Sequence, residues 1–315
     1  MVDLSVESLF PTQGAIDEAH QIGRADTIRS LASRALDHGD ALLLEPRKVG
    51  KTSVVRAALE HVRNDHGGIV ADVDCTSAGV NSGPTLARAL LRALRDGGGD
   101  VSRWLSAREV TIRSGRWRDR LRTTGDAAAQ FGVEEAKVVA PVLDLLVVEA
   151  PSLDDVLEEV ARLGAETTVV IFLDEIQAIT DWGDRADVEQ ALRRFLRRDG
   201  RCVTLIAAGS DRAAAEALFA AGQPLEWEFE PFNVPDIDAL DWHRGIVERF
   251  KRADLEISAA RIEQILAETG GQPWKTMLVA KKVLRETREA GQGAASVVGV
   301  DAAIAEAREH PSWDT

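Results

Sequence analysis

The sequence lacks a long apolar run, a signal-like start and all but two cysteines. No apolar stretch approaches the roughly 18 residues that a membrane-spanning helix needs, so we expect no membrane span. Residues 1–7 are acidic and lack the basic start and apolar core of a signal peptide. Cys75 and Cys202 both fall in predicted strands, where lone cysteines are typically small core residues rather than a disulfide or metal pair. These absences predict a cytoplasmic protein.

Composition is that of an ordinary soluble globular protein. The 315 residues are 45% hydrophobic and 29% charged, with a formal net charge of −14. At that charge the protein as a whole repels nucleic acid and acidic membranes. A nucleic-acid partner would therefore need a local basic patch, and we expect no membrane partner.

Predicted strands alternate with helices up to about residue 232, and helices alone follow. This order predicts a parallel-sheet α/β domain over residues 1–232 and an all-helical domain over residues 233–315. Apolar runs place strands at residues 41–44, 68–75, 167–173, 202–208 and 225–229. Helical patterns follow at about 84–94, 152–163, 187–198, 237–250, 262–266, 277–284 and from about 301.

Residues 44–53, Leu-Glu-Pro-Arg-Lys-Val-Gly-Lys-Thr-Ser, join the first strand to a helix. Strand, tight loop and helix is the setting in which Gly-Lys-Thr indicates phosphate binding, since loop N–H groups and the helix N-terminus both attract anions. Lys51 would reach the β- and γ-phosphates, and the Thr52 hydroxyl would bind Mg²⁺. The match is incomplete because Glu45 occupies the first glycine position, and Arg47 or Lys48 would have to pair with it. The candidate nucleotide-binding residues of this loop are Pro46, Arg47, Lys48, Val49, Gly50, Lys51, Thr52 and Ser53.

A second motif lies about 120 residues further on, where an apolar strand ends in Asp174 and Glu175. Carboxyl ends of parallel strands face the ligand crevice of an open α/β sheet. Asp174 would hold Mg²⁺ through water, and Glu175 would orient and deprotonate the attacking water. Ser210 ends the next strand, where its hydroxyl would either approach the γ-phosphate or cap the following helix. The predicted cofactors are therefore ATP or ADP and Mg²⁺.

These motifs, in this order with Gly23-Arg24 and Gly271-Gln272-Pro273, resemble the AAA+-related P-loop ATPases over about residues 15–290. The resemblance is closest to the archaeal-type ATPases and the STAND signalling ATPases. It implies a sheet of strand order 5-1-4-3-2 and a helical lid over the adenine. It also implies that Gly23 and Arg24 help form the nucleotide pocket, and that Pro273 brings lid backbone against the nucleotide. A helix cap followed by a helix-starting proline is the alternative interpretation of the glycine–proline step.

The chain departs from this family in two places. Replication-initiator relatives have an arginine at the position of Pro273, whereas here the nearest cation is Lys275. Ring-forming ATPases also carry an arginine just before the last core strand, and residues 222–228 contain none. Arg212 or the helical arginines at 193, 194, 197 and 198 are substitutes, although a solvated helix face explains the latter group more simply. A fast ring motor is therefore not expected, and after the lid we expect no room for a winged-helix domain.

Three functions remain open at this stage. The first is a slow, Mg²⁺-dependent ATPase switch whose lid moves about residues 233–235 and regulates a protein partner. The second is a nucleic-acid-associated initiator or loader, supported only by the arginine-rich insert at about residues 101–150. Between Arg103 and Arg122, seven arginines and two acids give a net charge of +5 beside two tryptophans, but pairing with the acidic remainder is the simpler explanation. The third is a non-hydrolysing nucleotide-bound scaffold. Assembly into an oligomer is left open.

Overall fold

The computed structural model describes residues 5–96 and 152–314. The chain divides into two compact units, one of residues 1–66, 206–216 and 229–315, the other of residues 67–205 and 217–228. The arginine-rich insert at about residues 101–150 lies outside the described residues. Within the described part, no helix is long and apolar enough to cross a membrane.

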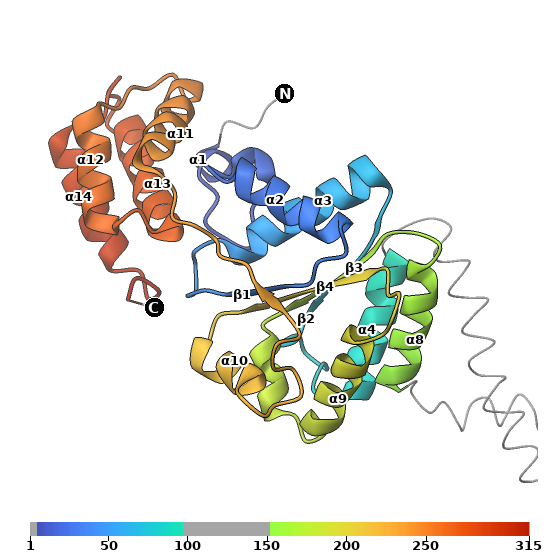
Figure 1. The fold of residues 1–315 in the computed structure, drawn as a ribbon. Coiled ribbons are helices and arrows are strands. Elements are labelled where there is room, and N and C mark those ends of the chain that lie inside the picture. The colour runs from blue at the N-terminus through green and yellow to red at the C-terminus, as the bar shows by residue number, and fades with distance from the viewer. Residues whose placement is uncertain (1–4, 97–151, 315) are drawn as a thin grey trace, which may run out of the picture. The chain divides into compact units, whose positions relative to one another are not determined.

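In the described part of the chain, five strands form one sheet in the order β2-β3-β4-β1-β5 (Figure 1). The strands are β1 (Ala41–Leu44), β2 (Ile69–Asp74), β3 (Val169–Asp174), β4 (Val203–Gly209) and β5 (Glu230–Pro231). β1 runs parallel to β4 and to β5, and β2 runs parallel to β3 in a register that sets Asp74 opposite Asp174. Every residue of β3 and β4 is buried, which explains why their sequences are apolar apart from Asp174 and Thr204. The predicted strand order is confirmed.

The predicted last strand at residues 225–229 is wrong. Two backbone hydrogen bonds, Glu226 N–H to the Gln223 carbonyl and Glu228 N–H to the Leu225 carbonyl, fold this stretch into turns. Trp227 takes a left-handed conformation with φ of 63° and is 89% exposed. The strand forms instead at β5, and its proline is tolerated because only one neighbour pairs with this edge.

The first unit contains the helices that flank the first strand. The 3₁₀ helix η1 (Glu18–His20) leads to α2 (Ala25–Leu36), and α3 (Lys51–His66) follows β1. α2 and α3 pack against each other. Each presents an apolar stripe at helical spacing, such as Ile28 and Leu31 on α2, and these side chains are fully buried.

Four helices of the same unit form the lid: α11 (Ala239–Arg252), α12 (Ala259–Thr269), α13 (Pro273–Glu289) and α14 (Val297–Arg308). The fourth begins before the predicted residue 301 because the Ser296 side chain caps it, accepting from Gly299 N–H at 3.0 Å. The short helix α1 (Val6–Leu9) and Phe10 join the apolar core of the lid. Arg249 of α11 links the N-terminal segment to the lid. It donates from Nε to the Leu9 carbonyl at 2.8 Å and from Nη2 to the His20 carbonyl at 2.7 Å.

In the second unit three helices lie side by side: α4 (Gly83–Asp96), α8 (Leu153–Gly164) and α9 (Arg185–Leu196) (Figure 1). α4 packs against β2 and α8 against β3. Ser152 and Asp155 form a reciprocal capping box that begins α8 where the sequence predicted it. α9 spans two residues earlier than the predicted 187–198 at each end. The 3₁₀ helix η2 (Ile176–Asp181) follows β3 directly.

Candidate functional site

The loop between β1 and α3 has the backbone of a phosphate-binding turn. Lys48 and Gly50 both take positive φ, at 66° and 93°. α3 begins at Lys51, so its first N–H groups lie beside the loop. A Cβ added at Gly50 would meet no atom within 4 Å, so within this chain the backbone angle is what favours glycine there. Left-handed turns of this kind point successive N–H groups toward one anion.

Lys51 is buried and folds back over the loop. Its Nζ donates to the carbonyls of Glu45 at 2.7 Å and Pro46 at 2.9 Å. Thr52 stands half-buried in the first turn of α3. Ser53 is buried and serves a different end: its hydroxyl accepts from Ile16 N–H at 3.1 Å and its carbonyl accepts from Gln21 Nε2 at 2.9 Å. Ser53 therefore fastens the preceding segment to the phosphate-loop helix.

Arg24 connects the phosphate loop to the start of the lid. Its guanidinium donates to the Val49 carbonyl at 3.2 Å and to the Pro235 carbonyl. The side chain is buried, and burial lowers the pKa of Arg24, with Asp236 acting in the opposite direction. Gly23 takes φ of 63° and leaves no space for a side chain, because a Cβ there would come within 2.8 Å of Asp241.

The glycine–proline step forms a helix junction. Gly270 is the left-handed cap of α12 with φ of 61°, and Gly271 follows with φ of 70°. Gln272 caps α13 by accepting from Lys275 N–H at 2.7 Å, and Pro273 is the first residue of that helix. This geometry matches the alternative interpretation, in which the glycines end one helix and the proline begins the next. It leaves the nucleotide contact of Pro273 as an expectation.

Arg47 and Ser210 meet across two strand ends. Arg47 Nε donates to Ser210 Oγ at 3.3 Å. Ser210 is not the cap of α10 (Arg212–Phe219), because Asp211 takes that role by accepting from Ala214 N–H at 3.0 Å. The hydroxyl of Ser210 therefore has one partner in the phosphate loop, and its approach to the γ-phosphate stays a prediction. Glu45, the unexpected carboxylate, adds to the effect of Glu216 in raising the pKa of Arg212.

The acidic pair ends β3 in the second unit. Asp174 is buried, and its Oδ1 accepts from Glu175 N–H at 3.0 Å. Glu175 takes a left-handed conformation with φ of 51°, uncommon for a non-glycine residue and often found at functional sites. Gln177 Nε2 donates to Glu175 Oε2. Sequence analysis missed Gln177, although its position two residues after the acidic pair was a usable signal.

The structure thus distributes the predicted residues over two units. Gly23, Arg24, residues 45–53, Ser210 and Pro273 belong to the first unit, and Asp174 and Glu175 belong to the second. Their strands share one sheet, in which β4 is the neighbour of both β1 and β3.

The two cysteines are free thiols, as predicted. Cys75 follows β2 and is buried, and burial raises the pKa of its thiol, with Asp74, Asp174 and Glu175 adding to the effect. A buried, protonated thiol is unreactive. Cys202 is only partly buried, and it directly precedes β4, so the prediction that it lies in a strand is wrong by one residue.

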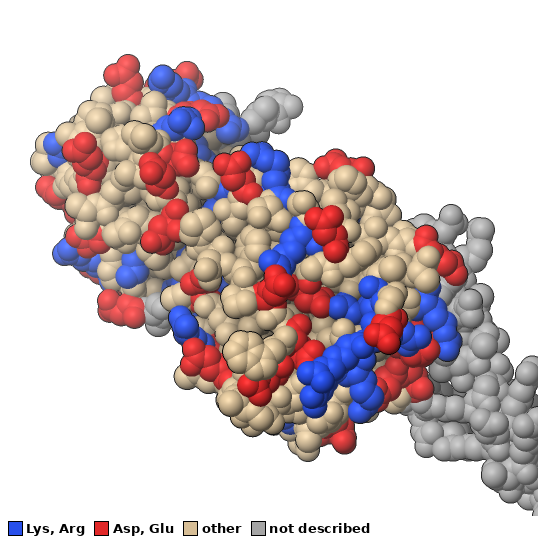
Figure 2. Space-filling view, viewed as in Figure 1, with Lys and Arg blue, Asp and Glu red and all other residues tan. Residues whose placement is uncertain are grey.

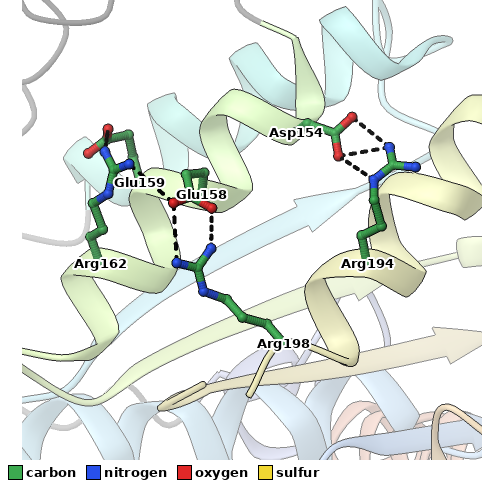
Figure 3. A network of polar contacts seen from close by, with 6 residues as sticks. All are labelled: Asp154, Glu158, Glu159, Arg162, Arg194 and Arg198. Atoms are coloured by element: carbon green, nitrogen blue, oxygen red, sulfur yellow. Dashed lines mark hydrogen bonds and ion pairs between the residues drawn. The ribbon is translucent and has the colours of Figure 1, made fainter. Parts of the chain in front are cut away.

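The arginines of α9 and its C-terminal end are engaged in ion pairs (Figure 3). Arg194 bonds Asp154 through both carboxylate oxygens, the closest contact being 2.8 Å, and Arg198 pairs with Glu158. Arg193 and Arg197 converge on Glu228 at 3.6 Å and 2.6 Å. These arginines therefore form an internally neutralised face, neither a purely solvated one nor a free cationic patch. Figure 2 shows the same mixing of acidic and basic side chains over the visible face.

Among residues 5–96 and 152–314, no group of three or more His, Cys, Asp or Glu side chains could hold a metal ion by itself. Magnesium in nucleotide sites is usually held by one or two protein oxygens together with phosphates and water. Thr52 and Asp174 supply oxygens of that kind. The donor set of the loop, with Arg47, Lys48 and Lys51 around left-handed turns, suits a polyphosphate.

Comparison with known proteins agrees with this geometry. The fold and loop are those of an AAA+-related P-loop ATPase. The family model described as AAA ATPase domain matches residues 21–206, and the chain belongs to that family. None of the curated proteins matches the sequence.

Several solved structures share the fold. The Walker-type ATPase PABY2304 of Pyrococcus abyssi has a TM-score of 0.63 at 17% identity, covering 96% of this chain and 75% of that one. The ORC2 protein of Aeropyrum pernix, in ADPNP-ADP complexes, has a TM-score of 0.61 at 14% identity, covering 95% and 71%. The RuvB Holliday junction branch migration motor of Thermotoga maritima has a TM-score of 0.53 at 14% identity, covering 95% and 72%. At such identities the likeness establishes the fold alone.

Proposed function

We propose that this protein is a slow, Mg²⁺-dependent ATPase that acts as a conformational switch. The observation that carries the proposal is the phosphate loop itself, with the buried Lys51 folded over it at the start of α3. Membership of the AAA ATPase domain family supports the same reading. ATP and ADP are the proposed ligands.

The predicted catalytic and metal-binding residues have the following roles in this scheme. Lys51 neutralises the β- and γ-phosphates, and Arg47, held toward Ser210, brings a second cation to the loop. Thr52 and Asp174 hold Mg²⁺, which when bound supplies charge neutralisation at the phosphates. Glu175 orients the attacking water and accepts its proton, with Gln177 holding one of its carboxylate oxygens.

The switch would operate through the link between loop and lid. Arg24 bonds both the Val49 carbonyl of the loop and the Pro235 carbonyl at the start of the lid. A shift of the loop around a γ-phosphate would therefore move Arg24 and change its bond to residues 233–235, the proposed hinge. A nucleotide can bias such a hinge only by as much as its contacts differ between the two conformations.

We infer slow turnover because no arginine in the described residues is placed as a ring motor requires. Residues 222–228 contain none. The α9 arginines are bound to Asp154, Glu158 and Glu228, and Arg212 pairs with Glu216 at 2.8 Å. A neighbouring subunit or a protein partner would have to draw one of them away from its carboxylate.

A nucleic-acid-associated role is the second candidate. The fold is shared with the Aeropyrum pernix ORC1 protein solved in complex with DNA, with a TM-score of 0.54 at 14% identity. The arginine-rich segment 103–122 is where such binding would occur. Salt-dependent binding to DNA that is lost when these arginines are replaced would favour this candidate.

The deciding experiment is the steady-state ATPase rate per subunit over a wide range of protein concentration, with Glu175→Gln as the blank. The switch predicts a slow rate that is independent of concentration and falls by about 100-fold or more in Glu175→Gln. Glu166→Gln, which alters an exposed carboxylate before β3, is the matched control and should keep the rate.

Other outcomes would redirect the proposal. A rate that climbs with concentration indicates that a neighbouring subunit completes the site. Bound nucleotide without turnover above the blank favours the non-hydrolysing scaffold.

A further inference from the structure

Residues 310–313, His-Pro-Ser-Trp, follow α14 and reach the phosphate loop through Lys48. Lys48 Nζ donates to the backbone carbonyl of Ser312. The same ammonium lies 4.1 Å from the ring centre of Trp274, a cation–π contact. The loop lysine that precedes Val49 and Gly50 is thus engaged by the far end of the lid, more than 260 positions along the chain.

Aromatic contacts hold this segment in place. The His310 ring meets Trp274 edge to face, with centroids 5.0 Å apart. His310 Nδ1 also accepts from Ser312 N–H at 3.1 Å, which fixes the turn that presents the Ser312 carbonyl. At the other end, Trp313 is only 8% exposed and packs in the lid core, with Lys275 Nζ 4.9 Å from its ring centre.

The surroundings of the Lys48 ammonium are electropositive. Burial lowers the pKa of Lys48, and the nearby charges of Lys275 and Arg47 lower it further. A cluster of like charges is relieved by an anion, and an ammonium bonds a phosphate more strongly than it bonds a neutral carbonyl. A polyphosphate entering the loop would therefore compete with Ser312 for Lys48.

We propose that residues 310–313 form a latch on the phosphate loop, which a nucleotide releases by taking Lys48 from the Ser312 carbonyl. This inference rests on the proposed nucleotide binding and names its regulation. The latch would give the switch a second response to nucleotide. Binding at the loop would free residues 310–313 directly, without a movement at residues 233–235. Since coupling is reciprocal, the closed latch must also weaken nucleotide binding.

A double-mutant cycle on the full-length protein tests the latch. His310→Ala removes the exposed ring that contacts Trp274 and bonds Ser312 N–H, and Lys48→Met removes the shared ammonium. The affinity for ADP with Mg²⁺ is measured by calorimetry for the parent, both single variants and the double variant. His66→Ala, at the exposed end of α3, is the matched control.

The latch predicts that His310→Ala tightens ADP binding about fivefold in the parent and has no effect once Lys48 is Met. Trp313→Leu is the second variant and should behave as His310→Ala does. Equal effects of His310→Ala with and without Lys48 would overturn the latch while leaving nucleotide binding intact. A parent protein that binds no ADP would overturn the proposed function, and the latch with it.

A structural readout separates release from simple weakening. Chymotrypsin cleavage after Trp313 should be slow in the free protein, where this ring is buried, and should accelerate when ADP is added. The rate in Lys48→Met should not respond to ADP. Unchanged protection of Trp313 at saturating ADP would contradict release.

Discussion

Arg24 in the first unit and Arg194 and Arg198 in the second use their charge in opposite ways. In the first unit, Arg24 is buried and donates to the carbonyls of Val49 and Pro235. In the second, Arg194 and Arg198 lie partly exposed and bond the carboxylates of Asp154 and Glu158 (Figure 3). Burial lowers the pKa of Arg24, whereas bonding to a carboxylate raises the pKa of Arg194 and of Arg198.

The contrast defines two classes of arginine. Arginines of the first class hold backbone segments through carbonyls, and the charge of the second class is neutralised by a carboxylate. A guanidinium that bonds carbonyls keeps its net charge and holds chain segments in place, so the region around it still attracts anions. A guanidinium that bonds a carboxylate contributes little field beyond its partner. Arginine content by itself is therefore a poor guide to where an anion binds, and the identity of the acceptor is the better one.

The largest expected effect comes from removing a cation of the phosphate loop. Lys51→Ala should weaken ADP binding and lower the ATPase rate by about 100-fold or more, because no other buried ammonium lies over this loop among the described residues. Arg193→Ala, which removes a cation paired with Glu228, is the matched control and should change neither. Calorimetry with ADP and a steady-state ATPase assay measure both. Equal losses of ADP affinity and ATPase rate in the two variants would contradict the distinction between loop cations and neutralised arginines.

Arg249 is another buried arginine that bonds backbone carbonyls, and it allows the effect of such an arginine on stability to be measured. It is buried, it donates to the carbonyls of Leu9, Gly245 and His20, and burial lowers its pKa to about 10. Arg249→Met should leave these carbonyls without a charged donor and lower the free energy of unfolding by about 3 kcal/mol. Urea unfolding monitored by circular dichroism gives this value.

The lowered pKa of Arg249 also fixes a pH dependence. Because the folded pKa of about 10 lies below the ordinary pKa of a guanidinium, the unfolded chain binds more protons between these two values. The contribution of this group to stability therefore rises with pH across that window, and Arg249→Met should remove the rise. A variant that kept the same slope would assign it to other groups.

The paired arginines of α9 should matter much less. Arg194 and Asp154 have side chains 59% and 52% exposed, so solvent screens their attraction. Arg194→Met should cost at most about 1 kcal/mol of stability, with most of that loss absent in high salt. Denaturant melts at two salt concentrations measure it, with Arg88→Met on α4 as an exposed arginine outside the network. A loss as large as that of Arg249→Met would contradict the comparison.

His61 offers the smallest and most specific test. It lies on α3 between Asp65 and Glu18, with contacts of 2.8 Å to each. The hydrogen bond to Asp65 raises the pKa of His61, and Glu18 raises it further. Its stabilising contribution should therefore be complete below pH 6.5 and be lost as pH rises through the raised folded pKa.

His61→Gln should make stability less dependent on pH in that window, by no more than about 1 kcal/mol. Thermal melts from about pH 6 to about pH 8.5 would show it. His66→Gln, one turn further along α3, should keep the parent profile. An unchanged profile in His61→Gln would place the titrating group elsewhere.

Much of the fold followed from sequence because its signals are local. Nearly continuous apolar runs identified β3 and β4, since a strand buried on both faces has few polar positions. The sequence predicted the start of α8 at Ser152, and the structure shows this residue capping the helix through a bond within four residues. The strand order came from the resemblance to a known family, not from the residues themselves.

The misplaced last strand shows where local signals end. Leu225 to Phe229 alternate as a strand does, but the turn after Gly222 continues through them and the backbone at Trp227 is left-handed. β5 forms where the chain reaches the free edge of β1. Pairing with a distant strand decided the outcome, and no window of sequence contains that partner.

The candidate site divides in the same way. The phosphate loop and the acidic pair after β3 could be predicted from the sequence, because each is a short motif with a fixed order of residue types. Helical patterns predicted an all-helical domain after residue 232, and its interpretation as a lid came from the resemblance. What each charge contacts could be seen only in the folded chain. Arg24 bonds two backbone carbonyls, Arg47 bonds Ser210, Lys48 bonds Ser312, and the α9 arginines bond carboxylates. The physical reason is that a charged side chain takes its partner from whatever the fold brings within about 3 Å, and most of these partners are far away in sequence.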